Sequence, residues 1–252
     1  MFITFFVISL ILKKDFNLLP FFISSFIVFA SGLYDDFIGL SAQKKLLLQL
    51  IAVLSLSCFG ILITDIRLPF VTFSNLGILS LPVTILWFML LTNLINIADG
   101  LDGLATGIYT LTLFVIWVWL PPSSISSQIL ISLGLTVAFL LFNFYPAKIF
   151  LGNSGSLFLG FSLAYFSIVA RQESTATFFL LIPITLLLIH VIDMLYAVYR
   201  RRKQGVSIFK GDKTHLHYLL LGKIVDHRKT VLLFYLATLI LAFFLMLGLS
   251  VF

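Results

Sequence analysis

The sequence predicts an all-α, polytopic integral membrane protein, and three observations support this prediction. Hydrophobic residues make up 61% of the 252 residues, charged residues make up only 10%, and the mean hydropathy is +1.16. A soluble domain is nearer half apolar and a quarter charged. The apolar residues form runs long enough for a bilayer core, which needs about 20 residues per helix. The remaining polar residues gather in short clusters between those runs.

These runs predict about eight spanning helices and a short partial helix at the N-terminus, all within a single membrane domain, 1–252. The expected spans are 17–34, 46–64, 78–97, 104–120, 129–145, 155–171, 177–199 and 230–251. The leading run, 1–12, is too short to cross a bilayer comfortably. The single cysteine, Cys58, lies in an apolar run, so we expect a buried thiol.

Basic residues predict the orientation, because cytoplasmic loops carry an excess of Lys and Arg. The side on which the 17–34 span ends carries twelve basic residues, and the other side carries four. We therefore expect the first side to be cytoplasmic and the net charge of +6 to serve orientation and lipid contact, with no nucleic-acid partner. The acids on this side are Asp35, Asp36, Asp99, Asp102, Asp212 and Asp226. Their position beside helix ends predicts an active site on the cytoplasmic face.

The first polar cluster is a carboxylate pair at a helix end. Asp35 and Asp36 close the 17–34 span, and Lys44 and Lys45 open the next. The negative end of a helix dipole disfavours anions, so a divalent cation or a nearby Lys should compensate the pair. A solvated loop pair is an equally good interpretation of these residues alone.

The second cluster, NLINIADGLDGLATG, repeats polar side chains at a spacing of three. Asn93, Asn96, Asp99 and Asp102 lie in otherwise hydrophobic sequence. Polar side chains at membrane depth are costly and usually functional. An Asx-rich turn with helix caps is the less favoured alternative.

The third cluster, FNFYPAKIFLGNSGSLFLGF, contains Lys148 and a small polar turn, Gly152–Ser156. Backbone N–H groups at the start of the following helix, with Ser154 and Ser156, would form a cradle for phosphate. Ser and Asn also cap helices for purely structural reasons.

The fourth cluster, 200–223, combines a basic run that includes Arg202 with His215 and His217. Orientation and contact with anionic lipid compete with a functional role for the basic run. Two histidines at a spacing of two are too weak a pattern for a zinc site. Together, the four clusters favour an Mg²⁺–pyrophosphate ligand, with a lipid as second substrate.

The four clusters, in this order, resemble the polyprenyl-phosphate N-acetylhexosamine-1-phosphate transferases, whose superfamily includes the phospho-MurNAc-pentapeptide translocase. The resemblance covers about residues 28–222 and is carried by DD-xxx-L…KLLLQ, N-xx-N-xx-DG-x-DGLA, PAK-x-FLG-x-SGS and HLH. It implies a bacterial cytoplasmic membrane enzyme that transfers a sugar-1-phosphate from a UDP-sugar to undecaprenyl phosphate, with Mg²⁺ or Mn²⁺. The products are UMP and the lipid-linked sugar that initiates a surface glycan. A homodimer is compatible with this assignment.

The resemblance also implies roles for particular residues. Asp35 and Asp36 would act at the reacting phosphates, while Asp99 and Asp102 would organise the metal and nucleotide site with Asn93 and Asn96. The metal ligands would be Asp99, Asp102 and Asn153. His215 is the remaining catalytic candidate. The other expected substrate contacts are Lys44, Lys45, Lys148, Ser154, Ser156, Arg202 and His217.

Three departures from the family pattern support an alternative, a truncated or degenerate relative that binds nucleotide or lipid without catalysis. Members usually begin with a further helix and a Pro- and Gly-rich loop, which are not found here before the first span. Asn153 stands where Asp is usual, and Tyr218 follows His217 where a second His is usual. The absence of a triple-histidine segment favours the N-acetylhexosamine branch. A transporter would place polar groups at the bilayer midplane, and the clusters lie at one surface.

Overall fold

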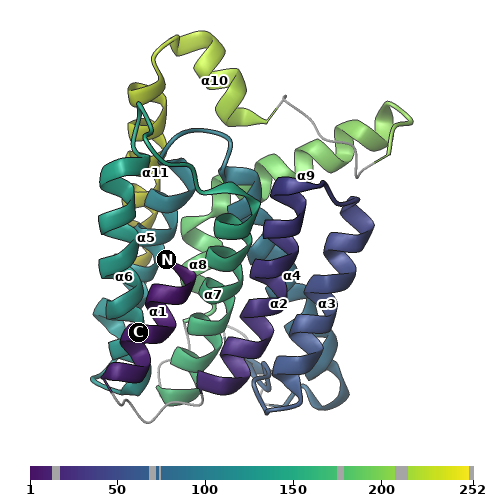
Figure 1. The fold of residues 1–252 in the computed structure, drawn as a ribbon, viewed down its shortest axis with the longest axis vertical. Coiled ribbons are helices and arrows are strands. Elements are labelled where there is room, and N and C mark those ends of the chain that lie inside the picture. The colour runs from purple at the N-terminus through teal and green to yellow at the C-terminus, as the bar shows by residue number, and fades with distance from the viewer. Residues whose placement is uncertain (13–17, 68–71, 74, 175–178, 208–214, 250–252) are drawn as a thin grey trace.

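The computed structural model describes residues 1–12, 18–67, 72–73, 75–174, 179–207 and 215–249 (Figure 1). The helices are α1 (Phe2–Ile11), α2 (Leu18–Phe37), α3 (Ala42–Ser57), α4 (Ser80–Ala98), α5 (Leu104–Trp119), α6 (Ser124–Asn143), α7 (Gly152–Glu173), α8 (Leu181–Leu186), α9 (Leu188–Lys203), α10 (Leu216–Ile224) and α11 (His227–Leu249). Between α3 and α4 lie an antiparallel pair of two-residue strands, β1 (Ile66–Arg67) and β2 (Thr72–Phe73), and a 3₁₀ turn, η1 (Gly77–Leu79). The helical class predicted from the sequence is confirmed.

Five helical segments in the described residues are long and apolar enough to cross a membrane, which confirms a multi-pass membrane protein. They are α2, η1 with α4, α6, α7 and α11. The other three expected spans are shorter or interrupted. Helices α3 and α5 have 16 residues each, and the 177–199 run divides at Leu187 into α8 and α9. The count of eight spans stays a prediction.

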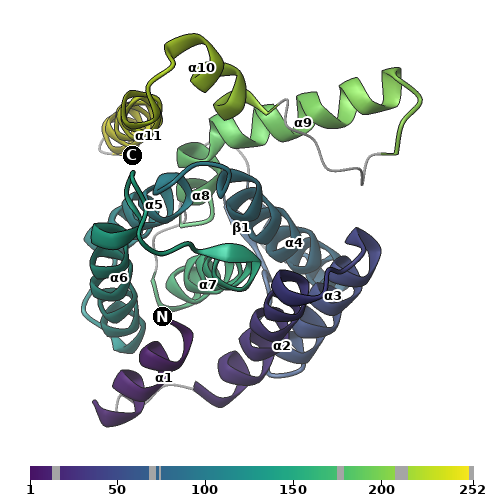
Figure 2. The same ribbon diagram turned by 45° about the horizontal axis from the view of Figure 1, so that its top comes forward.

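Helix α7 occupies the centre of the bundle, with α1, α2, α4, α5 and α6 around it (Figure 2). Every residue from Ser156 to Ala170 is buried. A helix that is apolar on all sides and surrounded by other helices belongs to the core of the fold rather than to its lipid-facing surface. Because α7 is central, its N-terminal segment, Gly152–Ser156, lies among the ends of the surrounding helices.

Two glycines allow α7 to approach its neighbours closely. A Cβ on Gly32 of α2 would lie 2.5 Å from Ser154 Cα, and a Cβ on Gly160 of α7 would lie 2.5 Å from Thr92 Cα in α4. Small residues at helix contacts in membranes let backbones come together in this way. Gly32 brings the end of α2 directly against the start of α7.

The polar clusters lie at one end of the bundle. The C-termini of α2, α4 and α6 and the N-termini of α3, α5 and α7 meet there, and α10 lies over the same end (Figure 1). Helix α9 extends from this end away from the bundle (Figure 2). The opposite end carries β1, β2 and an ion pair between Arg171 and Asp65. The acids predicted to share one side do so, except Asp212, which lies outside the described residues.

Two local expectations are wrong. Cys58 is exposed, because α3 ends at Ser57 and Cys58 is its C-cap. The Gly152–Ser156 segment is the first turn of α7 rather than a loop before it. The helix begins this early because Ser156 Oγ donates to Gly152 O (2.8 Å), while the free N–H groups that follow Gly152 are bound by a carboxylate from α2.

Candidate functional site

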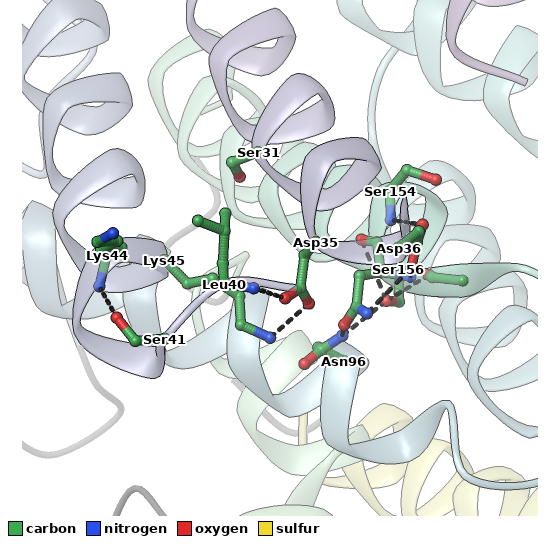
Figure 3. Close-up of polar contacts among 12 residues, drawn as sticks. Ser31, Asp35, Asp36, Leu40, Ser41, Lys44, Lys45, Asn96, Ser154 and Ser156 are labelled. Carbon is green, nitrogen blue, oxygen red and sulfur yellow. Dashed lines mark hydrogen bonds and ion pairs between the residues drawn. The ribbon is translucent and has the colours of Figure 1, made fainter. Parts of the chain in front are cut away.

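The carboxylate of Asp36 binds the N-terminus of α7 (Figure 3). Asp36 Oδ1 accepts from the backbone N–H of Asn153 (2.8 Å) and from its side-chain Nδ2 (3.0 Å), and Oδ2 accepts from Ser154 N (3.0 Å). The N–H groups and the helix dipole at an N-terminus favour an anion. The predicted phosphate cradle is thus occupied by the protein's own carboxylate, which also compensates Asp36 for its place at the C-terminus of α2.

Asp35 is compensated separately by Lys45. Lys45 Nζ lies 2.7 Å from Asp35 Oδ2, and Leu40 N donates to Asp35 Oδ1 (2.6 Å). These contacts close the loop between α2 and α3 (Figure 3). The sequence offered a cation or a nearby Lys as compensation for the pair, and in the structure Lys45 serves one acid and a helix N-terminus serves the other.

Asn96 of α4 braces the start of α7. Its Nδ2 donates to Asn153 Oδ1 (3.0 Å) and to Ser156 Oγ (2.8 Å). Ser156 is fully buried, so its hydroxyl supports Asn96 and the helix start. Asn93, one turn earlier, donates to Gln49 Oε1 (2.9 Å) and so joins α4 to α3. The two asparagines hold together the helices that carry the acids.

Asp99 and Asp102 extend the carboxylate cluster. Asp99 is the C-cap of α4, and its backbone N–H donates to Asn96 O (3.3 Å), but no hydrogen bond or ion pair in the described chain involves its carboxylate. Burial, with the added charges of Asp36 and Asp102, raises the pKa of Asp99 to about 8. Asp102 Oδ2 accepts from Ala147 N (3.1 Å) and ties its loop to the segment before α7. Asp36 and Asp102 therefore both repel charge on Asp99, whose carboxylate has no partner among the described residues.

This donor set is compatible with a hard divalent cation that also binds substrate. Within the described residues no group of three or more His, Cys, Asp or Glu is arranged to hold a metal by itself. Magnesium commonly uses one or two carboxylates and completes its shell with phosphate oxygens and water. Asp99 and Asp102 fit that role. Asn153 fits it less well, because its Oδ1 accepts from Asn96 and its Nδ2 donates to Asp36.

The histidines form a second polar group beside the acids. His215 Nδ1 lies 2.9 Å from Asp193 Oδ2, and the rings of His215 and His217 are parallel with centroids 5.8 Å apart. His217 Nε2 occupies the space that a Cβ on Gly100 would fill, so a larger residue there would displace the His217 ring. Burial, with the charge of His215 as a smaller cause, lowers the pKa of His217 to about 4.

Asp193 and His190 are polar residues of this group that the sequence reasoning missed. Both lie in α9, within the run interpreted as an apolar span, and both are buried. Asp193 is the only acid in 177–199, and that isolation was the available signal.

The other expected substrate contacts remain open to solvent. The side chains of Lys44, Lys148 and Arg202 are exposed, and within the described chain no ion pair joins them to an acid. Arg202 lies in the last turn of α9, the helix that extends away from the bundle. Their charges are available to an anionic ligand or to lipid headgroups.

An open apolar groove of about 430 Å³ runs between α2 and α3 next to the Asp35 loop. Its lining includes Phe26, Ala30, Tyr34, Leu40 and Leu48. Leu40 connects it to the site, because its backbone N–H donates to Asp35. The acids thus have an apolar surface beside them that suits a hydrocarbon chain.

Fold and site together define a class: a multi-pass helical membrane protein with carboxylates, amides and a helix N-terminus gathered at one end of the bundle. Residues 18–171, more than half of the chain, match glycosyl transferase family 4. The chain belongs to that family.

Similar proteins carry related names. The chain is 37% identical over 218 residues to a Bacillus subtilis protein named "Probable undecaprenyl-phosphate N-acetylglucosaminyl 1-phosphate transferase", covering 85% of this chain and 61% of that protein. It is 35% identical over 243 residues to the decaprenyl-phosphate N-acetylglucosaminephosphotransferase of Mycobacterium leprae, covering 84% and 60%. It is 31% identical over 198 residues to a phospho-N-acetylmuramoyl-pentapeptide-transferase of Clostridium beijerinckii, covering 75% and 60%. The chain thus spans about three fifths of these relatives' length.

Proposed function

We propose that the chain transfers an N-acetylhexosamine-1-phosphate from a UDP-sugar to undecaprenyl phosphate at the cytoplasmic face of a bacterial inner membrane. An oxygen of the lipid phosphate attacks the phosphorus that bears the sugar. The bond from that phosphorus to the bridging oxygen breaks, and UMP leaves with the electron pair. The lipid-linked product would initiate a surface glycan such as an O-antigen, teichoic acid or capsule.

The observation that supports this proposal most is the convergence of Asp36, Asp99 and Asp102 beside the N-terminus of α7. The three acids come from α2, the end of α4 and the following loop. Asp36 and Asp102 both raise the cost of charge on Asp99, and both accept hydrogen bonds from backbone N–H groups. Phosphoryl transfer depends mainly on positioning and on electrostatic stabilisation. When bound, Mg²⁺ or Mn²⁺ would neutralise charge on the phosphates and on these acids.

The chain's own residues then have separate tasks. Asp99, whose carboxylate has no partner among the described residues, is the carboxylate most available to a cation or a proton. Asp36 and Asn96 fix the start of α7 at the site, and Lys45 keeps Asp35 in place. The apolar groove beside Leu40 supports a lipid acceptor whose phosphate reaches the acids. The names of the relatives, which include polyprenyl-phosphate transferases, support the same substrate class.

One observation favours a second candidate, a relative that binds nucleotide or lipid without catalysis. Asn153 cannot offer the anionic oxygen of an aspartate, and its amide is already engaged by Asn96 and Asp36. This candidate predicts binding of UDP-sugar or UMP by the purified protein, with no turnover in the presence of Mg²⁺.

Membranes containing the chain, supplied with undecaprenyl phosphate, Mg²⁺ and radiolabelled UDP-N-acetylhexosamines, test the proposal. Labelled lipid and released UMP in equal amounts are the expected products. Asp99→Asn and Asp36→Asn should abolish both. Asp226→Asn is the matched control, because Asp226 is an acid at the same end of the bundle that only caps α11 and pairs with Lys229. No labelled lipid with any UDP-sugar, while a known transferase works, would overturn the proposal.

A further inference from the structure

Asp193 is a buried acid in α9 with both oxygens engaged. Its Oδ2 lies 2.9 Å from His215 Nδ1, and its Oδ1 accepts from Leu216 N (3.0 Å). The side chains of Asp193 and His215 are only 7% and 10% exposed. One carboxylate therefore binds both the imidazole of His215 and the first N–H group of α10, and it joins α9 to α10.

This pair of contacts restricts the imidazole. A carboxylate can only accept, so Nδ1 of His215 must carry the proton, and Nε2 is left with a lone pair when the ring is neutral. The second bond, to Leu216 N, keeps the carboxylate from rotating away. No hydrogen bond to His215 Nε2 occurs in the described chain, so among those residues nothing competes with a ligand for this atom.

The ring of His217 connects His215 to the loop that follows Asp99. His217 lies parallel to His215, and its Nε2 packs against Gly100, the residue after Asp99. His190 lies in α9 three residues before Asp193, and its ring centroid is 5.4 Å from that of Phe234. In the described chain, the ionisable groups near enough to interact with His215 are thus Asp193, His190 and His217.

We propose that Asp193 is a positioning residue: it holds His215 with the proton on Nδ1, so that Nε2 contacts a phosphate of the sugar nucleotide. Contact with a phosphate rests on the proposed transferase function, whereas the tautomer does not. Acceptors behind metal-bound imidazoles set the ring's orientation and basicity, and their loss commonly costs 10–100-fold in affinity or activity. We expect a loss in the same range for an imidazole that contacts a phosphate.

Nuclear magnetic resonance of the full chain in detergent, labelled with ¹⁵N at histidine, tests the tautomer directly. The His215 signal, assigned by its loss in His215→Gln, should show a protonated Nδ1 and an unprotonated Nε2 at neutral pH. Asp193→Asn can donate its amide to Nδ1 and should move the proton to Nε2. An unchanged tautomer in Asp193→Asn would overturn the inference, whatever the activity.

Kinetics test the consequence. Asp193→Asn should lower kcat by roughly 10–100-fold with KM for the UDP-sugar changed by about twofold or less, and Asp193→Glu should recover part of the loss. Asp226→Asn removes a charge, keeps an oxygen that can accept from Lys229 N, and touches no imidazole, so it should leave kcat unchanged.

The two experiments separate the inference from the proposed function. Equal effects of Asp193→Asn and Asp226→Asn on kcat would reduce Asp193 to a structural cap of α10 and overturn its positioning role. A wild-type chain with no transferase activity but with the expected tautomer change would contradict the function and retain the Asp193–His215 relationship.

Discussion

Asn153 donates to Asp36 through both its backbone and its side-chain amide, so the two residues join the end of α2 to the start of α7. An aspartate at position 153 would place a second carboxylate about where the amide donates now, 3.0 Å from Asp36 Oδ1. Asparagine permits this contact without a cation.

Asn153→Asp should therefore destabilise the protein in the absence of a divalent cation, by about 2 kcal/mol, because a hydrogen bond to a charged group becomes a repulsion. Added Mg²⁺ should raise the unfolding temperature of this variant more than that of the wild type. Thermal unfolding in detergent, with and without Mg²⁺, measures both effects. Asn75→Asp is the control, since Asn75 is exposed and only accepts from Gly77 N. Equal Mg²⁺ responses of variant and wild type would contradict this account of the site.

Asp99→Asn should stabilise the fold while it removes activity. The pKa of Asp99 is raised to about 8, so folding favours its protonated form and the cost of its charge grows as pH rises from about 4 to about 8. The variant's gain in unfolding temperature over wild type should be small near pH 4 and largest above pH 8. Unfolding scans across this range without divalent cations provide the measurement, and a variant less stable than wild type at pH 8 would refute the prediction.

Gly32→Ala should separate α2 from α7. The new methyl group would lie 2.5 Å from the Cα atom of Ser154. Because that atom belongs to the backbone, it cannot move aside as the end of a flexible side chain could. We expect a loss of about 1–3 kcal/mol in stability, typical of overpacking, together with reduced transfer activity. Gly134→Ala is the matched control, because Gly134 is also helical and has open space around its Cβ position. Similar unfolding temperatures for the two variants would exclude this role for Gly32.

Protonation of His217 should make the free energy of unfolding fall at acidic pH. Its pKa falls to about 4 in the folded protein from an ordinary value of 6.5, mainly through burial. The unfolded chain therefore takes up this proton first, and stability falls as pH drops from about 6.5 towards 4, by up to about 3 kcal/mol. His217→Gln cannot titrate and should flatten this part of the stability profile. Chemical unfolding at pH 4.5, 5.5, 6.5 and 7.5 compares the two proteins, and parallel profiles would disprove the assignment.

The sequence predicts the helical class, the end of the bundle where the acids gather, and the membership of Asp36, Asp99 and Asp102 in one site. Hydropathy and charge determine these features locally, so they can be seen in short windows of sequence. The division of the 177–199 run at Leu187 is not visible in that way, because its apolar residues fit one helix as well as two.

The contacts inside the site could not be predicted from local patterns. Asp36 meets Asn153 across 117 positions of sequence, and the meeting depends on Gly32 packing against Ser154. A single sequence does not show which carboxylate fills which helix N-terminus. The sequence reasoning missed Asp193 because an apolar run usually faces lipid. In the structure, the carboxylate of Asp193 faces the imidazole of His215.

Because α7 is buried, the geometry of the site should not depend on the thickness of the bilayer. Helices that face lipid adjust to a thinner or thicker membrane by tilting. From Ser156 to Ala170, however, α7 has no surface on which lipid can act. Changes in acyl-chain length should therefore be absorbed by outer helices such as α6 and α11, while the contact between Asp36 and the start of α7 keeps its geometry in membranes of different composition.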